Sequence, residues 1–162
     1  MGRMTHDKTT MAPIIALYQP DIPQNTASII RTCSCFDLKV EIIEPCGFSL
    51  DDRRFKRVVM DYYSKEMMKN YDSWTNFIKF KKKMSQRVLL LTTKTKKSFF
   101  EFKFKSGDTI LFGRESSGVP EEVHNQVTER LTIPISKNKR SLNLSSSVSM
   151  TICESLRQIK LF

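Results

Sequence analysis

Residues 14–43 read IIALYQPDIPQNTASIIRTCSCFDLKVEII, and their hydrophobic period changes twice. The first five residues are an unbroken apolar run that ends near two prolines, which predicts a buried strand. Apolar residues then recur at helical spacing over 24–36, behind Asn25 as the expected helix cap: Ile29, Ile30, Cys33 and Phe36. A second apolar run at 40–43 stops before a proline and a glycine. Strand, helix and strand in this order are typical of a parallel sheet.

The rest of the chain continues this alternation. We expect further strands at 87–92, 108–112 and 131–133, a partly helical segment at 51–60, a surface helix at 71–78, and an amphipathic helix at 145–162. No repeat, linker or low-complexity block divides the sequence. The prediction is therefore a single α/β domain over 12–162, with a mostly parallel sheet flanked by helices. Residues 1–11 are expected to be a flexible tail, with Met1 and Met11 as alternative starts.

Charge and composition narrow the class of protein. The net charge is +10, and residues 51–105 carry all of the excess, with 16 Lys plus Arg against 6 Asp plus Glu. A basic surface attracts phosphate-rich polymers, although lysine runs are also common on solvated faces. No apolar run is long enough to span a membrane, and no secretory signal is visible. The four cysteines form no CxxC pair and only two histidines are present, so we expect reduced thiols, no metal and a cytoplasmic protein.

The first of three polar motifs opens the first predicted helix. It runs from Asn25 to Arg31. A helix start can offer a side-chain amide and free N–H groups to an anion. The alternative is a plain cap followed by an exposed arginine.

The second motif is LFGRESSGVPEE at 111–122. Gly113 and Gly118 would let the backbone approach a ligand closely, and Glu115 follows the strand at the edge where open α/β sheets bind ligands. The motif is not a Walker A loop. The glycine fingerprint of a Rossmann-type nucleotide binder is also missing after the first strand.

The third motif combines Ile133-Pro134-Ile135 with RSLNLSSSV at 140–148. Its serines and its asparagine stand at the mouth of an apolar helix, where they could contact a ligand. A helix cap would need only one of them.

Together the three motifs closely resemble those of the SpoU branch of the SPOUT methyltransferase superfamily, over essentially all of 13–162. The family pattern is N-x-G-x-x-x-R, then F-G-x-E-x-x-G-x-P, then I-P-I/M followed by S-L/M-N-L/V-S. Two further stretches, 17–25 and 43–48, are similar to the small group in that branch that methylates the ribose of the wobble nucleotide (cytidine or uridine 34) of tRNA. The sequence departs from the pattern at Ala27, where the family has glycine. The added methyl group of Ala27 could narrow the gap through which RNA approaches the helix backbone.

The resemblance implies a fold with a deep C-terminal trefoil knot, a homodimer and a tRNA substrate. It implies S-adenosyl-L-methionine as cofactor, with S-adenosyl-L-homocysteine as product. The residues implied to line the cofactor are Leu91, Thr92, Gly113, Glu115, Gly118, Ile133, Ser141 and Leu142.

The resemblance also assigns catalytic residues. Arg31 is the arginine proposed in the family to assist the reaction, but arginine is almost always protonated and is a poor base. We expect Arg31 to clamp the target phosphate or ribose, with the proton leaving through a phosphate oxygen or Glu115. The remaining residues would orient the nucleotide or the arginine: Asn25, Ser141 and Asn143.

Two other readings of the same sequence stay open. The first is a SpoU-type enzyme acting on another tRNA position or on ribosomal RNA. The second is a relative that binds RNA without methylating it.

Overall fold

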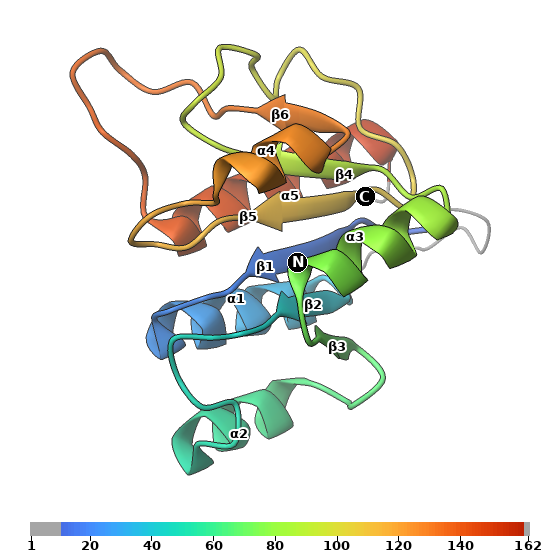
Figure 1. Ribbon diagram of the computed structural model, residues 1–162, viewed down its shortest axis with the longest axis vertical. Coiled ribbons are helices and arrows are strands. Elements are labelled where there is room, and N and C mark those ends of the chain that lie inside the picture. Colours follow the sequence, from blue (N-terminus) through green and yellow to red (C-terminus); the bar gives the residue numbers. More distant parts are fainter. Residues whose placement is uncertain (1–10, 161–162) are drawn as a thin grey trace.

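The computed structural model describes residues 11–160, which form a six-stranded sheet (Figure 1). All strand pairs are parallel, and the strand order is β3-β2-β1-β5-β4-β6. The strands are β1 (Ile14–Tyr18), β2 (Val40–Ile43), β3 (Met68–Tyr71), β4 (Val88–Leu91), β5 (Thr109–Phe112) and β6 (Glu129–Leu131). The predicted α/β class and the parallel sheet are confirmed. The path of the chain through a knot stays a prediction.

Helices cover both faces of the sheet (Figure 1). They are α1 (Pro23–Cys35), α2 (Arg53–Tyr62), α3 (Trp74–Lys83), α4 (Glu121–Gln126) and α5 (Leu144–Ile159). One core joins α1, α2 and α5 to the alternating strand residues that include Leu17 and Phe112. The second core joins α3 and α4 to the opposite set, which includes Ala16 and Leu111. No helix within 11–160 is long and apolar enough to cross a bilayer.

Side-chain caps set the start of three helices. Asp52 Oδ1 accepts from the N–H groups of Arg54 and Phe55, and Ser73 and Asn143 cap α3 and α5 in the same way. The prediction that Asn25 caps α1 is wrong. The helix starts earlier, at Pro23, whose fixed φ suits the first helical position and whose nitrogen needs no partner.

Two strands differ from the sequence prediction. β3 was missed, and Tyr71 ends this strand instead of opening the surface helix, which runs from Trp74. As an edge strand β3 buries only Tyr71, so its sequence lacks an apolar pattern. The last strand is 129–131 rather than 131–133, because Thr132 continues only as an isolated bridge to Ser98. Residues 1–10 of the expected tail lie outside the described residues.

A buried ion pair joins α3 to the sheet. Lys81 is 1 % exposed, and its Nζ lies 2.8 Å from Glu41 Oε1 on β2 and 3.0 Å from Gln86 Oε1. Burial lowers the pKa of Lys81, and the facing carboxylate of Glu41 opposes that shift. The positive charge of Lys81 is thus tolerated in the core because the Glu41 carboxylate faces it.

We predict that Glu41→Ala lowers the free energy of unfolding by about 3–5 kcal/mol, because it leaves the buried Lys81 charge without its counter-charge and with only the neutral Gln86 as partner. The double variant Glu41→Leu/Lys81→Met should be close to wild type, since it removes both charges. Urea denaturation of the three proteins checks this. A single variant as stable as wild type would contradict it.

Candidate active site

A cavity of about 540 Å³ lies at the carboxyl ends of β4 and β5. Its wall comes from the residues that follow these strands, from the segment after β6, and from the loop that enters α5. β1 and β5 are neighbours in the middle of the sheet. From β1 the chain continues through α1 to β2 and β3 in one half of the sheet, whereas β4 and β6 lie beside β5 in the other half. Such a switch point at the carboxyl ends is where open α/β sheets bind ligands. The volume suits a molecule of nucleoside size.

The eight residues proposed to contact the cofactor all line this cavity: Leu91, Thr92, Gly113, Glu115, Gly118, Ile133, Ser141 and Leu142. Four separate stretches of the chain supply them: 91–92, 113–118, 133 and 141–142. Leu90, Leu91 and Ile133 add apolar surface. The wall is therefore partly apolar with a few placed polar groups, which is the usual character of a small-molecule site.

The turn after β5 depends on its two glycines. Arg114 and Gly118 exchange backbone hydrogen bonds of 2.9 and 3.0 Å, which fold the turn on itself. A Cβ on Gly113 would lie 2.7 Å from the carbonyl carbon of Gly118, and Gly118 has φ +65°. A side chain at Gly113 would thus collide with backbone, and a side chain at Gly118 would be strained by the positive φ. Other residues fit at these two positions only if the turn changes shape.

The loop after β1 contacts this turn across the switch point. Arg114 donates to Gln19, Ser116 donates to Asp21, and Asp21 N–H donates to Glu115 Oε2 over 3.3 Å. Gln19 is held at φ +41°, a left-handed conformation that is uncommon for residues other than glycine. Two short loops are thus fixed against each other by side-chain contacts.

The two carboxyl groups of this contact titrate in opposite directions. Burial, with the Asp21 carboxyl next to it, raises the pKa of Glu115. The hydrogen bonds from Glu115 and Ser116 lower the pKa of Asp21. Glu115 Oε1 and Asp21 Oδ1 are buried without a hydrogen-bond partner among the described residues. The arrangement places a carboxyl group that holds its proton more readily than usual in the wall of the cavity.

The five residues proposed for catalysis do not all meet. Asn25, Glu115, Ser141 and Asn143 line the cavity, and Asn143 Oδ1 also caps α5 through a 3.2 Å bond from Ser146 N–H. Arg31 lies outside the cavity wall, on an exposed part of α1. Its guanidinium carbon is 5.3 Å from the centroid of the Tyr62 ring on α2.

Two residues at the site were not predicted as site residues from the sequence: Asp21 and His124. His124 on α4 is only 6 % exposed, and it lines the cavity. Its burial, with Lys94 nearby, lowers its pKa, so the imidazole is neutral near pH 7. Asp21 could have been suspected from its position directly beyond the first strand.

The surroundings of the cavity favour an anionic group on its ligand. The N-terminal ends of α1 and α5 meet there, and Ser28 Oγ and Ser145 Oγ join them over 2.9 Å. Helix N-termini carry partial positive charge and free N–H groups. Within residues 11–160 no three side chains of His, Cys, Asp or Glu gather as a metal site. The four cysteines are free, and burial raises the pKa of the Cys33 thiol to about 12.

Comparison with known proteins gives a consistent result. Residues 12–153 match the model of the SpoU rRNA Methylase family. A tRNA (cytidine(34)-2′-O)-methyltransferase of Beijerinckia indica is 41 % identical over 146 residues, which cover 90 % of this chain and 91 % of that protein. The protein of the same name from Escherichia coli K12 is 34 % identical over 90 % of this chain and 92 % of its own. A solved structure described as giving "structural insights into the 2-OH methylation of C/U34 on tRNA" superposes with a TM-score of 0.84 at 34 % identity, covering 91 % of this chain and 96 % of the other.

The carboxyl pair predicts a pH-dependent change in stability. A group whose pKa is raised by folding stabilises the protein below its unfolded pKa, and this contribution is lost as the pH rises through its folded pKa. Glu115→Gln should therefore be more stable than wild type at pH 8 and similar to it at pH 4.5, where Glu115 is protonated. Urea denaturation at both pH values checks this, with Glu121→Gln as an exposed control. An equal difference at both pH values would be evidence against the shifted carboxyl.

The tight turn after β5 leads to a prediction about ligand affinity. Gly113→Ala should lower the affinity for S-adenosyl-L-methionine at least tenfold, because the new methyl group collides with the backbone of Gly118 and moves the cavity wall. Calorimetric titration measures the affinity, and thermal unfolding shows whether the variant still folds. Unchanged affinity in a folded variant would show that the turn does not contact the ligand.

Proposed function

The chain belongs to the SpoU rRNA methylase family, and we propose that it transfers a methyl group from S-adenosyl-L-methionine to the ribose 2′-hydroxyl of cytidine or uridine 34 of tRNA. The observation that carries this proposal is similarity over about nine tenths of both chains to proteins named for that reaction. The cavity at the switch point supports it, since every residue expected around the cofactor faces it.

The residues present suit this cofactor. Leu91, Ile133 and Leu142 provide apolar surface for a purine, and Gly113 leaves room for close backbone contact. The N-termini of α1 and α5 suit a carboxylate. When bound, the cofactor supplies an activated methyl group on a sulfonium, so the protein has only to position the hydroxyl and remove its proton.

Glu115 is the residue that we propose for proton removal. A 2′-hydroxyl is a weak nucleophile near neutral pH and needs a proton acceptor. A carboxylate becomes a better acceptor as its pKa rises towards the working pH, and both burial and the Asp21 carboxyl raise the pKa of Glu115. Asp21 would keep this shift in place, and Asn25 and Ser141 would orient the nucleotide.

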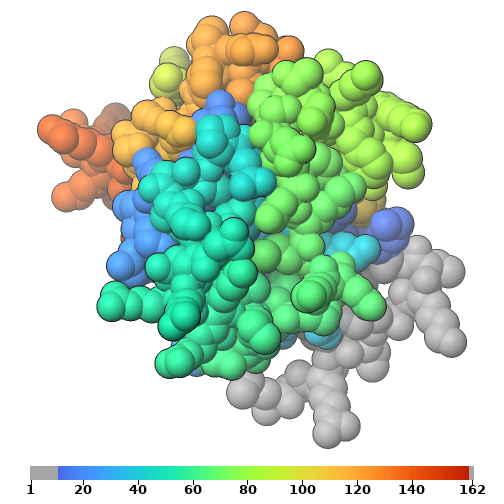
Figure 2. Space-filling model, turned by 60° about the horizontal axis from the view of Figure 1, so that its bottom comes forward, coloured from blue at the N-terminus to red at the C-terminus, as the bar shows by residue number. Residues whose placement is uncertain are grey.

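Arg31 would bind the RNA backbone. It is exposed, it remains charged, and its planar guanidinium can hold a phosphate with two hydrogen bonds. Its guanidinium lies over the Tyr62 ring of α2, a helix exposed on the face shown in Figure 2 that carries four further basic residues: Arg53, Arg54, Lys56 and Arg57. We also propose that the protein acts as a cytoplasmic homodimer with the knotted topology of its family. Met150, 46 % exposed on α5, would contribute to the contact between subunits.

A methyl-transfer assay tests the proposal. Labelled S-adenosyl-L-methionine is incubated with the protein and bulk tRNA, and the modified nucleotide is mapped. Label on the ribose of nucleotide 34 is expected. Label at another tRNA position, or on ribosomal RNA only, would keep the enzyme class and overturn the substrate.

We predict that Arg31→Ala lowers kcat/KM for tRNA at least a hundredfold and leaves cofactor affinity unchanged, because Arg31 lies outside the cavity. Arg31→Lys should recover only part of the loss, since an ammonium cannot replace a two-point contact. Steady-state kinetics and calorimetric titration separate the two effects. Near-normal turnover by Arg31→Ala would remove Arg31 from the mechanism.

A further inference from the structure

The connection between β4 and β5 has an unusual composition. Residues 94–105 read KTKKSFFEFKFK, with five lysines, four phenylalanines and a single acidic residue, Glu101. We refer to them as the Lys-Phe segment. It contains no helix and runs across the end of the sheet that carries β6, from the exit of β4 back to the start of β5 (Figure 1).

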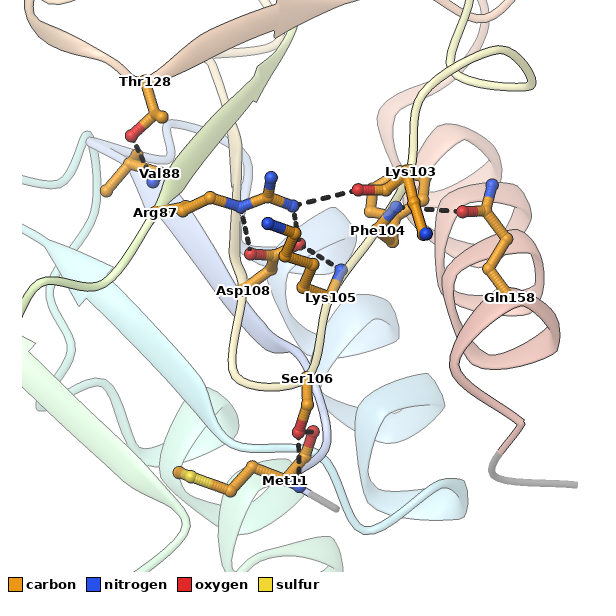
Figure 3. A network of polar contacts seen from close by, with 10 residues as sticks. All are labelled: Met11, Arg87, Val88, Lys103, Phe104, Lys105, Ser106, Asp108, Thr128 and Gln158. Carbon is orange, nitrogen blue, oxygen red and sulfur yellow. Dashed lines mark hydrogen bonds and ion pairs between the residues drawn. The ribbon is translucent and has the colours of Figure 1, made fainter.

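Polar contacts fix the end of the segment near β5 (Figure 3). Arg87 pairs with the 2 % exposed Asp108 through two bonds of 2.7 and 2.6 Å, and it donates to the carbonyl of Lys103 over 3.1 Å. Asp108 also accepts from Lys105 N–H over 2.7 Å, and Gln158 of α5 accepts from Phe104 N–H over 2.9 Å. This end is thus tied to β5 and to α5.

The other end is tied to the wall of the active-site cavity. Phe99 N–H donates to Thr132 O over 2.9 Å, and Thr132 N–H donates to Lys97 O over 2.8 Å. Thr132 and Lys94 both line the cavity. Phe100 therefore comes directly after a residue whose backbone is bonded to the cavity wall.

The four phenylalanines have different surroundings. Phe99 and Phe104 are buried, and Phe102 lies between two cations, with Arg87 Cζ 5.0 Å and Lys97 Nζ 5.4 Å from its ring centroid. Phe100 is 61 % exposed. Its centroid is 4.3 Å from that of Phe99 at 50°, so a buried ring supports it from one side. An aromatic ring is thus held out to solvent by a segment fixed at both ends.

Exposed lysines flank Phe100 in the sequence of the segment. The five lysines of the segment are all exposed, and among the described residues only Lys97 has an ion pair, with Glu129 over 2.6 Å. Exposed ammonium groups near an aromatic ring match the two parts of a single-stranded nucleic acid, a phosphate chain and unstacked bases. Lysine is depleted in the cores of protein interfaces, so a protein partner fits this surface less well.

We infer that Phe100 stacks on an unpaired base of the substrate RNA while Lys96 and Lys103 bind its phosphates, beside the cavity where the methyl group is transferred. The inference deepens the proposed function and rests on it. The anticodon loop, which contains nucleotide 34, offers such unpaired bases.

Variants at one position separate stacking from simple apolar contact. Phe100→Ala and Phe100→Leu should each weaken tRNA binding about tenfold, since stacking of one base on an aromatic ring is worth this order of affinity. Phe100→Tyr should bind like wild type because it keeps an aromatic face. Met84→Ala removes another exposed apolar side chain and should change nothing. Filter binding gives the affinity, and calorimetry with S-adenosyl-L-homocysteine should give the same cofactor affinity for all four.

The lysines should affect a different quantity, the salt dependence of RNA binding. Lys96→Ala/Lys103→Ala should reduce the slope of log affinity against log salt concentration by about 1.4, from roughly 0.7 per phosphate contact on a single strand. Phe100→Ala should leave that slope unchanged.

Two results would overturn the inference. One is wild-type RNA affinity in both Phe100→Ala and Phe100→Leu. The other is wild-type affinity in Phe100→Leu together with a changed oligomer size in Phe100→Ala by sedimentation, which would make the surface a contact between copies of the chain. Failure of the proposed function is read separately, from the position of the methyl group that the wild-type enzyme adds.

Discussion

The parallel pairing of β1 with β5 is the constraint on which the rest of the site depends. Ile14 to Leu17 lie opposite Thr109 to Phe112, so two strands that are 95 residues apart in sequence end at the same edge of the sheet. Their following loops must therefore meet, and the contacts Gln19–Arg114 and Asp21–Ser116 are the result. Because the connections then diverge to opposite sides of the sheet, the space beyond these loops stays open and becomes the cavity.

Several features that would be unfavourable in a purely structural domain gather at this point. Two carboxyl groups share one small volume, and Gln19 adopts a left-handed conformation. Outside the site, side chains cap α2, α3 and α5, and the buried charges of Lys81 and Glu41 face each other. Shifted pKa values and uncommon backbone conformations are typical of functional sites, where they serve the chemistry.

The sequence predicted elements whose burial leaves a pattern. β4 and β5 are continuous apolar runs, and α5 repeats its buried residues at helical spacing. β3 was missed because an edge strand buries little, and the start of α1 was misplaced because Pro23 outweighed Asn25. The three polar motifs identified the cavity wall, but they could not show that Asp21 faces Glu115 or that Arg31 lies over Tyr62. Those contacts depend on tertiary placement, which local patterns do not contain.

The pairing of β1 also affects how the protein is made. Met11, just before β1, exchanges hydrogen bonds with Ser106 over 2.6 and 2.8 Å (Figure 3), and its carbonyl also accepts from Gly107 N–H over 3.1 Å. These partners are synthesised 95 residues later. At ribosomal speeds of about 5–20 residues per second, one edge of a fully apolar strand waits roughly 5–20 s for its neighbour. During that interval β1 can be protected only by elements made before β5, such as α1, β2 and α3, so the first half of the chain must shield its own core on the ribosome.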